Sequence, residues 1–180
     1  VANSDPVSLY EAVEEGKIIL ASPGGVSPRE IKEQFTGALL RKLTEVFQTR
    51  DGSSEMFFLS IEPLHFQLSE YHLDDLFTTA RGCNVGLIPM IQYLSQLNED
   101  DQNLILSNCE NLVCFNTSEM QSANKLTSIL DVEGRKELME LPLYTVFAKL
   151  SARCGTAQQK FETFPRLEPR REIDDYSRYL

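Results

Sequence analysis

The sequence predicts an α/β protein whose sheet is largely parallel, and the prediction rests on three observations. Short apolar runs bounded by turn residues alternate with segments of helical periodicity, as in proteins built from strand–helix–strand units. The 180 residues, 42% hydrophobic and 24% charged, are enough for one compact domain with its own core. No linker, internal repeat or low-complexity segment interrupts them, so residues 1–180 are expected to form a single domain.

The first predicted elements are a short helix and a strand. Ser8 is suited to cap a helix over residues 8–15, with Glu11 three residues on as its capping-box partner, and Gly16 ends that helix. Residues 17–21, Lys-Ile-Ile-Leu-Ala, are a short apolar run between turn residues. Such a run predicts a buried strand.

A long helix is predicted from Ser27 to about Gln48. Ser27 at the cap, Pro28 at the first helical position and Glu30 at the third are a strong helix start. Apolar residues then recur at helical spacing and predict a single stripe that faces the core. They are Ile31, Phe35, Ala38, Leu39, Leu43, Val46 and Phe47.

Three further strands and three helices are predicted downstream. The strands are the apolar runs at residues 56–61, 85–90 and 111–115. The helices are residues 73–81, closed by Gly82, a short helix within 94–106, and residues 118–130, with Ser118 as the candidate cap.

The C-terminal part is expected to hold a β-hairpin and a tail. Residues 143–150 and 160–164 are β-rich and suit a hairpin around residues 153–155. Basic residues gather in the last part of the chain, from about 165 to 180, but acidic neighbours offset them. A solvated tail is therefore expected there.

Composition argues against several classes of function. A net charge of −10 disfavours a broad DNA-binding face, although it leaves room for DNA contact through a few loops in an assembly. The four cysteines are dispersed, with no CxxC pair, so a zinc site or a cysteine nucleophile has little support. No apolar run approaches the ~20 residues that span a bilayer, and no signal peptide is visible. The chain is expected to be cytoplasmic, with free thiols and no membrane contact.

Ligands of open α/β sheets bind beyond the carboxyl ends of the strands, so the residues that follow each strand are the candidate site. Residues 22–25, Ser-Pro-Gly-Gly, follow the first predicted strand. They lack the Gly-Lys-Ser/Thr that would cradle phosphates and hold magnesium. A tight loop is the expected structure there.

Three polar residues at the ends of other elements are candidates for nucleotide chemistry. Glu62 follows a strand at the place where a motor ATPase keeps its metal-ordering and water-activating carboxylates, but Ile61 stands where a second acid is usual. The alternative is a solvated glutamate at a strand end, which the motif alone favours. Gln92 suits a γ-phosphate sensor or an ordinary polar residue at a helix start. Arg81 suits an arginine that acts on a neighbouring subunit, or a surface charge.

Several segments follow one another in a characteristic order. The first are a helix, Gly-Lys and an apolar strand at residues 9–20, and then a long helix that ends at Arg50. An apolar strand that ends in Glu62, an Ala-Arg-Gly helix end at 80–82 and a strand leading to Gln92 follow. The last are a strand at 108–115 preceded by Asn, Leu-Pro-Leu-Tyr at 141–144 and a closing Tyr-Ser-Arg-Tyr at 176–179. This order resembles the ATPases of the HerA/FtsK superclass. The likeness is closest to the coupling-protein ATPases of conjugation and type IV secretion.

The resemblance implies a RecA-like fold of the P-loop NTPase type. Its expected form is a three-layer, mostly parallel sheet with a C-terminal β-hairpin extension. Glu62 falls on the Glu position of the Walker B strand, Gln92 on the sensor Gln and Arg81 on the arginine of the helix end. ATP and Mg²⁺ are the cofactors of intact relatives. Two departures matter, because the Walker A strand and loop would lie before Val1 and because Ile61 replaces the Walker B Asp.

Two functions from different classes follow from these residues. The first is a part, or a degenerate homologue, of an ATP-driven DNA-translocating or secretion-coupling motor that cannot hydrolyse ATP alone and holds no cofactor by itself. Such a chain would work in a homo-oligomeric ring, or with a partner protein that supplies the missing elements. The second is a catalytically silent protein-binding or scaffold module with the same fold. A third, an unrelated small α/β enzyme, has no nucleophile or cofactor fingerprint to support it.

Overall fold

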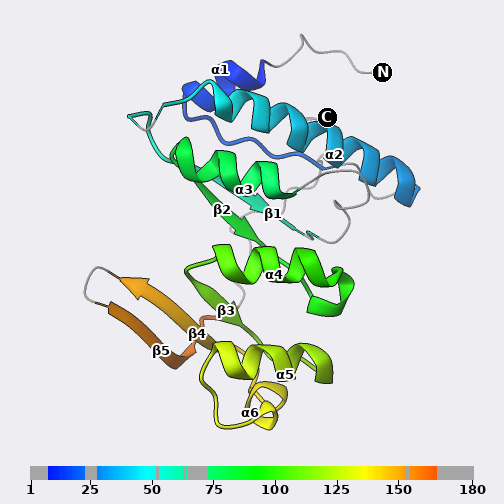
Figure 1. Ribbon diagram of the computed structural model, residues 1–180, viewed down its shortest axis with the longest axis vertical. Coiled ribbons are helices and arrows are strands. Elements are labelled where there is room, and N and C mark those ends of the chain that lie inside the picture. The colour runs from blue at the N-terminus through cyan, green and yellow to red at the C-terminus, as the bar shows by residue number, and fades with distance from the viewer. Residues whose placement is uncertain are drawn as a thin grey trace. The chain divides into compact units, whose positions relative to one another are not determined.

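The computed structural model describes residues 8–22, 28–51, 53–62, 64, 73–152 and 155–165 (Figure 1). The chain divides into two compact units. The described residues up to Asn108 form the N-terminal unit, and those from Cys109 onward form the C-terminal unit. The single domain expected over the whole chain stays a prediction.

The first helix of the N-terminal unit, α1 (Leu9–Glu14), begins where the sequence predicts. The backbone N–H of Glu11 donates to Ser8 Oγ at 3.3 Å, which satisfies one of the free donors of the first turn. Gly16 adopts a φ of +65°, in the left-handed region that glycine enters without steric cost. The predicted start and end of this helix are therefore confirmed.

The strand predicted over residues 17–21 is wrong. Residues 17–22 have no regular secondary structure, and the side chains of Ile18 and Leu20 are 91% and 93% exposed. A strand forms only beside another strand that accepts and donates its backbone hydrogen bonds. None of the described strands pairs with this segment, which explains why an apolar run alone misleads.

Two predicted helix caps need correction. The long helix α2 (Arg29–Gln48) starts at Pro28, which takes the cap position without a side-chain hydrogen bond, and the expected cap Ser27 lies outside the described residues. In the C-terminal unit, α5 (Met120–Ile129) has Glu119 rather than Ser118 at its cap position. The helices themselves are confirmed, because their apolar periodicity and not their caps determines where they lie.

The apolar stripe of α2 is buried only in the C-terminal half of the helix. Leu43, Val46 and Phe47 are at most 5% exposed. Ile31 and Phe35, which belong to the same predicted stripe, are 53% and 44% exposed. The first half of the helix therefore presents apolar side chains that are about half exposed.

A parallel pair of strands forms the centre of the N-terminal unit. β1 (Phe57–Ile61) pairs with β2 (Val85–Pro89), in a register that sets Phe57 opposite Val85 and Ile61 opposite Pro89. The helix α3 (Leu73–Gly82) makes the crossover between them. These three elements match the predicted strands and helix closely.

The helices α2 and α3 lie on one face of this strand pair (Figure 1). Phe57, Leu59 and Ile61 alternate along β1 toward that face, and their burial increases along the strand. The ring of Phe47 on α2, which is fully buried, lies 5.6 Å from the ring of Phe57. From α3, Leu73, Leu76 and Ala80 complete this core.

The chain leaves β2 through a 3₁₀ turn and another helix. The turn η2 (Leu94–Gln96) is closed by Gln96, whose side chain accepts from the Tyr93 backbone N–H at 3.1 Å. The helix α4 (Glu99–Asn108) starts after Asn98, whose Oδ1 accepts from the Asp101 backbone N–H at 2.8 Å. This agrees with the short helix predicted within residues 94–106.

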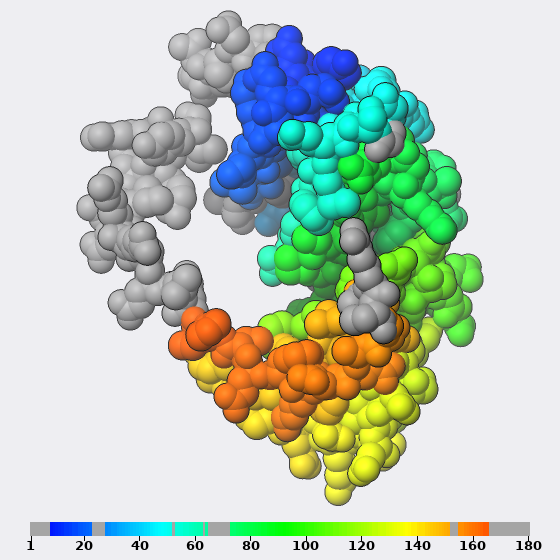
Figure 2. All heavy atoms as spheres, turned by 90° about the vertical axis from the view of Figure 1, so that its left-hand side faces the viewer, coloured from blue at the N-terminus to red at the C-terminus, as the bar shows by residue number. Residues whose placement is uncertain are grey.

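The C-terminal unit is built on an antiparallel sheet of three strands. β3 (Leu112–Cys114), β4 (Thr145–Ala152) and β5 (Gly155–Glu162) lie in that order, and eight residue pairs join β4 to β5. The predicted hairpin is confirmed, and Figure 2 shows β5, in orange, at the surface. The helices α5 and α6 (Arg135–Met139) pack together in this unit, and α6 was not predicted.

The sheet is less parallel than the sequence suggests. β3 was expected to join a parallel sheet, but it runs antiparallel to β4, so β1 and β2 are the only parallel pair among the described strands. In the N-terminal unit the described helices α2 and α3 share one face of the strand pair, and the three layers expected of the whole fold stay a prediction. The expected tail beyond residue 165 lies outside the described residues.

No helix of the described part is long and apolar enough to cross a membrane.

Replacing Phe47 with Ala should lower the free energy of unfolding by about 3–5 kcal/mol, because the ring is fully buried and leaves a cavity against Phe57. Phe35→Ala, on the same helix but at a 44% exposed position, should cost less than about 1 kcal/mol. Chemical denaturation followed by circular dichroism measures both. Equal losses would show that the core is not where the structure places it.

Candidate functional site

The carboxyl ends of β1 and β2 lie side by side. Ile61, the last residue of β1, is opposite Pro89, the last residue of β2. The pairing continues past the strands, because Met90 N–H donates to Ile61 O at 3.0 Å and Leu64 N–H donates to Met90 O at 2.9 Å. The backbone on both sides of Glu62 is thereby fixed against the chain that leads to Gln92.

Glu62 and Gln92 are brought to this one edge of the strand pair. Glu62 comes directly after Ile61, and Gln92 comes three residues after Pro89. Both side chains are exposed. An acid that can accept a proton and an amide that can donate to a phosphate oxygen thus stand on neighbouring strand ends, as the sequence predicts.

Ile61 belongs to the core. Its side chain is 6% exposed and faces α2 and α3 together with Phe57 and Leu59. Because side chains alternate along a strand, the side chain before Glu62 points away from the exposed edge. Among the described residues this strand end presents a single carboxylate, that of Glu62.

Arg81 lies at the opposite edge of the strand pair. It is in the last turn of α3, and β2 begins at Val85, four residues later. A five-residue strand spans about 16 Å, so Arg81 is separated from Glu62 by roughly the length of β2. Its side chain is exposed. The structure therefore groups Glu62 with Gln92 and leaves Arg81 apart from them within one chain.

The second face of the strand pair is apolar and exposed, which the sequence reasoning missed. Met56, Phe58, Ile88 and Met90 are 57%, 63%, 44% and 40% exposed. We call these four residues the free face. The signal was present in the sequence, because near-continuous apolar runs such as residues 56–61 are typical of parallel strands covered on both faces.

Phe58 and Gly86 show how closely the free face is packed. They are opposite each other in the register, and a Cβ on Gly86 would lie 2.6 Å from the ring of Phe58. The ring therefore rests directly on the backbone of β2. The missing side chain at Gly86 makes room for the aromatic ring on this face.

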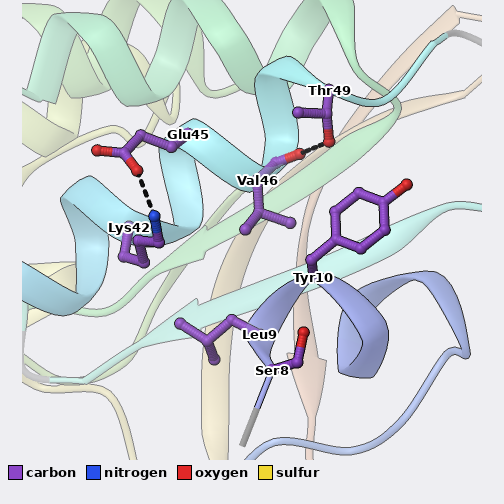
Figure 3. Close-up of a pocket in the computed structure, with 7 residues that line it drawn as sticks. All are labelled: Ser8, Leu9, Tyr10, Lys42, Glu45, Val46 and Thr49. Atoms are coloured by element: carbon purple, nitrogen blue, oxygen red, sulfur yellow. Dashed lines mark hydrogen bonds and ion pairs between the residues drawn. The ribbon is translucent and has the colours of Figure 1, made fainter.

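A separate groove lies between α1 and α2 (Figure 3). It has a volume of about 480 Å³ and is mainly apolar. Its lining residues are Ser8, Leu9, Tyr10, Lys42, Glu45, Val46 and Thr49. Lys42 Nζ lies 2.7 Å from Glu45 Oε2 across its rim. The groove contains neither Glu62, Gln92 nor Arg81, so it is distinct from the strand-end site.

Cys109 and Cys114 have the character of structural thiols. Burial raises the pKa of Cys114 to about 11, and it also raises the pKa of Cys109. A thiol that holds its proton more tightly is a weaker nucleophile at neutral pH. No cluster of three or more His, Cys, Asp or Glu side chains suited to a metal occurs in the described ranges, and both histidines lie outside them.

No protein-family model and no curated protein matches this chain. Solved structures do match it. The plasmid coupling protein TrwB, in complex with a non-hydrolysable ATP analogue, gives a TM-score of 0.63 at 15% identity over 76% of this chain and 38% of TrwB. The unbound form of this bacterial conjugative coupling protein gives 0.61 at 14% identity, over 72% of this chain and 37% of TrwB.

A viral protein shares the same fold. B204, the DNA-packaging ATPase of Sulfolobus turreted icosahedral virus, gives a TM-score of 0.54 at 14% identity, over 78% of this chain and 66% of B204. The chain thus spans less than two fifths of TrwB and just under two thirds of B204. The predicted likeness is confirmed at the level of fold, because TrwB and B204 share the fold of this chain over about three quarters of its length.

The raised pKa of Cys114 has a consequence for stability. The native thiol keeps its proton up to about pH 11, whereas the ordinary thiol pKa is 9.0. The unfolded chain therefore binds fewer protons between these pH values, and the free energy of unfolding falls as pH rises through this window. We expect the wild type to lose stability between pH 9 and 11 relative to the Cys114→Val variant, measured by urea denaturation.

Cys83→Val is the matched control, since Cys83 is half-buried in the other unit. It should keep the loss of stability that Cys114 causes between pH 9 and 11. Titrations of lysines and tyrosines are common to all three proteins and cancel in the difference. Parallel pH profiles for the wild type and Cys114→Val would contradict the raised pKa of Cys114.

Proposed function

We propose that this chain carries the switch side of a nucleotide site, as part or degenerate homologue of an ATP-driven DNA-translocating or secretion-coupling motor. The observation that supports it most is the parallel register of β1 and β2, because the two strands end together, one residue before Glu62 and three residues before Gln92. In RecA-like folds the nucleotide binds at the carboxyl ends of the parallel strands. The fold similarity to TrwB and B204 supports the same interpretation.

Each residue has a chemical role in this proposal. The Glu62 carboxylate accepts a proton from the water that attacks the γ-phosphate, and the Gln92 amide binds that phosphate or orients the water. ATP with Mg²⁺ is the nucleotide of the completed site. Ile61 is buried against the helices, so the described residues of this strand end offer no second acid to order the magnesium shell.

The chain alone is proposed not to hydrolyse ATP. Nowhere in the 180 residues does Gly-Lys precede Ser or Thr, which a phosphate-binding loop requires. The missing elements would come from a further segment or a partner protein. The free face supports this, because parallel sheets are stable when helices cover both faces and here one face exposes Met56, Phe58, Ile88 and Met90.

A silent binding or scaffold module is the second candidate. The buried Ile61 favours it, because a motor that orders Mg²⁺ places an acid at that position. Under this alternative the free face and the fold remain, while Glu62 and Gln92 are ordinary exposed residues. The net charge of −10 restricts DNA contact, under either candidate, to a few loops in an assembly.

Mg-ATP should bind to this chain with a Kd above about 1 mM, which corresponds to less than about 4 kcal/mol of binding free energy. Phosphate release should not exceed the background. Fusion of a strand and phosphate-binding loop upstream of Val1 should restore Mg-ATP binding and support slow turnover, because Ile61 still leaves the magnesium shell without a second acid. In that fusion, Glu62→Gln should lower kcat at least about 100-fold, because it removes the general base. Calorimetry and a phosphate-release assay measure these quantities.

Glu55→Gln is the matched control, since Glu55 is an exposed glutamate just before the other end of β1. It should leave turnover of the fusion unchanged. Micromolar binding and Glu62-dependent hydrolysis by the chain alone would overturn the proposal that the chain lacks a working phosphate-binding loop. Binding and turnover by the fusion that do not depend on Glu62 would overturn its role at the site.

Arg81 is proposed to act on a neighbouring subunit of a homo-oligomer, because it lies at the opposite edge from Glu62. In the active fusion, Arg81→Ala should lower kcat about 10³-fold and leave the Mg-ATP Kd unchanged. Arg41→Ala, an exposed arginine on α2, is the control. A mixture of the Arg81→Ala and Glu62→Gln fusions should recover activity. No recovery in mixed assemblies would reject action between subunits.

A further inference from the structure

The helix α1 is held on α2 by few contacts. It has six residues, which is too short to be stable as a helix without tertiary contacts. Ala12 and Val13 are its buried side chains, at 4% and 2% exposed. After Gly16, the chain continues as residues 17–22, in which only Ile19 is even half-buried.

Arg50 is a buried cation at the end of α2. Its side chain is 3% exposed, and Nη1 donates to Glu14 Oε1 of α1 at 3.2 Å. Nη2 donates to the backbone carbonyl of Glu55, just before β1, and Nε has no partner. Among the described residues Glu14 is the one acid paired with Arg50, and its own side chain is 39% exposed.

This arrangement makes the pair asymmetric. Glu14 can turn toward water, but Arg50 stays enclosed by the end of α2 and the chain before β1. A buried charge that loses its partner is strongly destabilising, whereas a partly exposed one is not. The ion pair therefore couples the docking of α1 to the buried charge of Arg50, which lies at the end of α2.

We propose that the Glu14–Arg50 pair is a clasp that holds α1 on α2, and that opening it releases α1 and residues 17–22 together while the core of the N-terminal unit stays folded. The released part has few buried contacts, whereas Phe47, Leu73 and Leu76 of the core are at most 2% exposed. Segments with few buried contacts open below the global unfolding free energy. The exposed Ile18 and Leu20 belong to the released segment, so the clasp determines whether these two apolar side chains are held near α1 or released.

Hydrogen exchange followed by mass spectrometry tests the clasp. In the wild type, amides of residues 8–22 should exchange faster than those of α3. Glu14→Gln should raise the exchange rate of residues 8–22 about tenfold and leave α3 unchanged. Glu15→Gln is the matched control, because Glu15 is the next residue and its pair with Lys17 is exposed on both sides. It should leave α1 as in the wild type.

Val13→Ala separates the clasp from ordinary apolar docking. If α1 is held by apolar contacts alone, Val13→Ala speeds its exchange and Glu14→Gln does not, which would overturn the proposal. Equal exchange of α1 and α3 in the wild type would also overturn it, because the two would then open as one unit. These outcomes do not depend on ATP, so they are independent of the function proposed for Glu62.

Discussion

The parallel pairing of β1 with β2 is the constraint on which the rest of the N-terminal unit depends. Its register determines that Ile61 and Pro89 end together, and so that Glu62 and Gln92 share one edge. The crossover through α3 follows from it, because parallel neighbours need a long connection that returns the chain to the starting edge. That return places Arg81 at the far edge. One register thus assigns all three polar candidates their places.

The same pairing explains why described helices cover only one face of the β1–β2 pair. The crossover helix α3 and the preceding α2 cover one face, and the covered side chains include Phe57 and Ile61. On the other face, Phe58 and Ile88 remain exposed, with the ring of Phe58 close to Gly86. A parallel pair with one bare apolar face is a partial sheet in physical terms. TrwB and B204, which have a similar fold, extend beyond the region that matches.

Local chemistry was predictable from the sequence, and pairing was not. Ser8 and Gly16 mark the ends of α1 because a side-chain cap and a left-handed glycine act within a few residues. The apolar run around Ile18 was predicted as a strand, yet strand formation depends on a partner far away in sequence. The direction of β3 was missed for the same reason, since an apolar run does not encode which neighbour it pairs with. The edge shared by Glu62 and Gln92 followed from one general rule about parallel strands, whereas the clasp at Arg50 has no local signature.

The alternation of side chains along β1 links the missing acid to the core. Ile61 faces α2 and α3, and Glu62 is the next residue and is exposed. An aspartate in place of Ile61, with the backbone as it stands, would carry its carboxylate among apolar side chains that offer it no partner in the described core. Burying an unpaired charge is strongly unfavourable, so the change would destabilise the unit before it could bind magnesium. The second acid could therefore not be supplied by a substitution of Ile61 alone. It is incompatible with the way this strand packs while the other face is bare, and a layer on the free face would have to alter that packing before two acids could share the strand end.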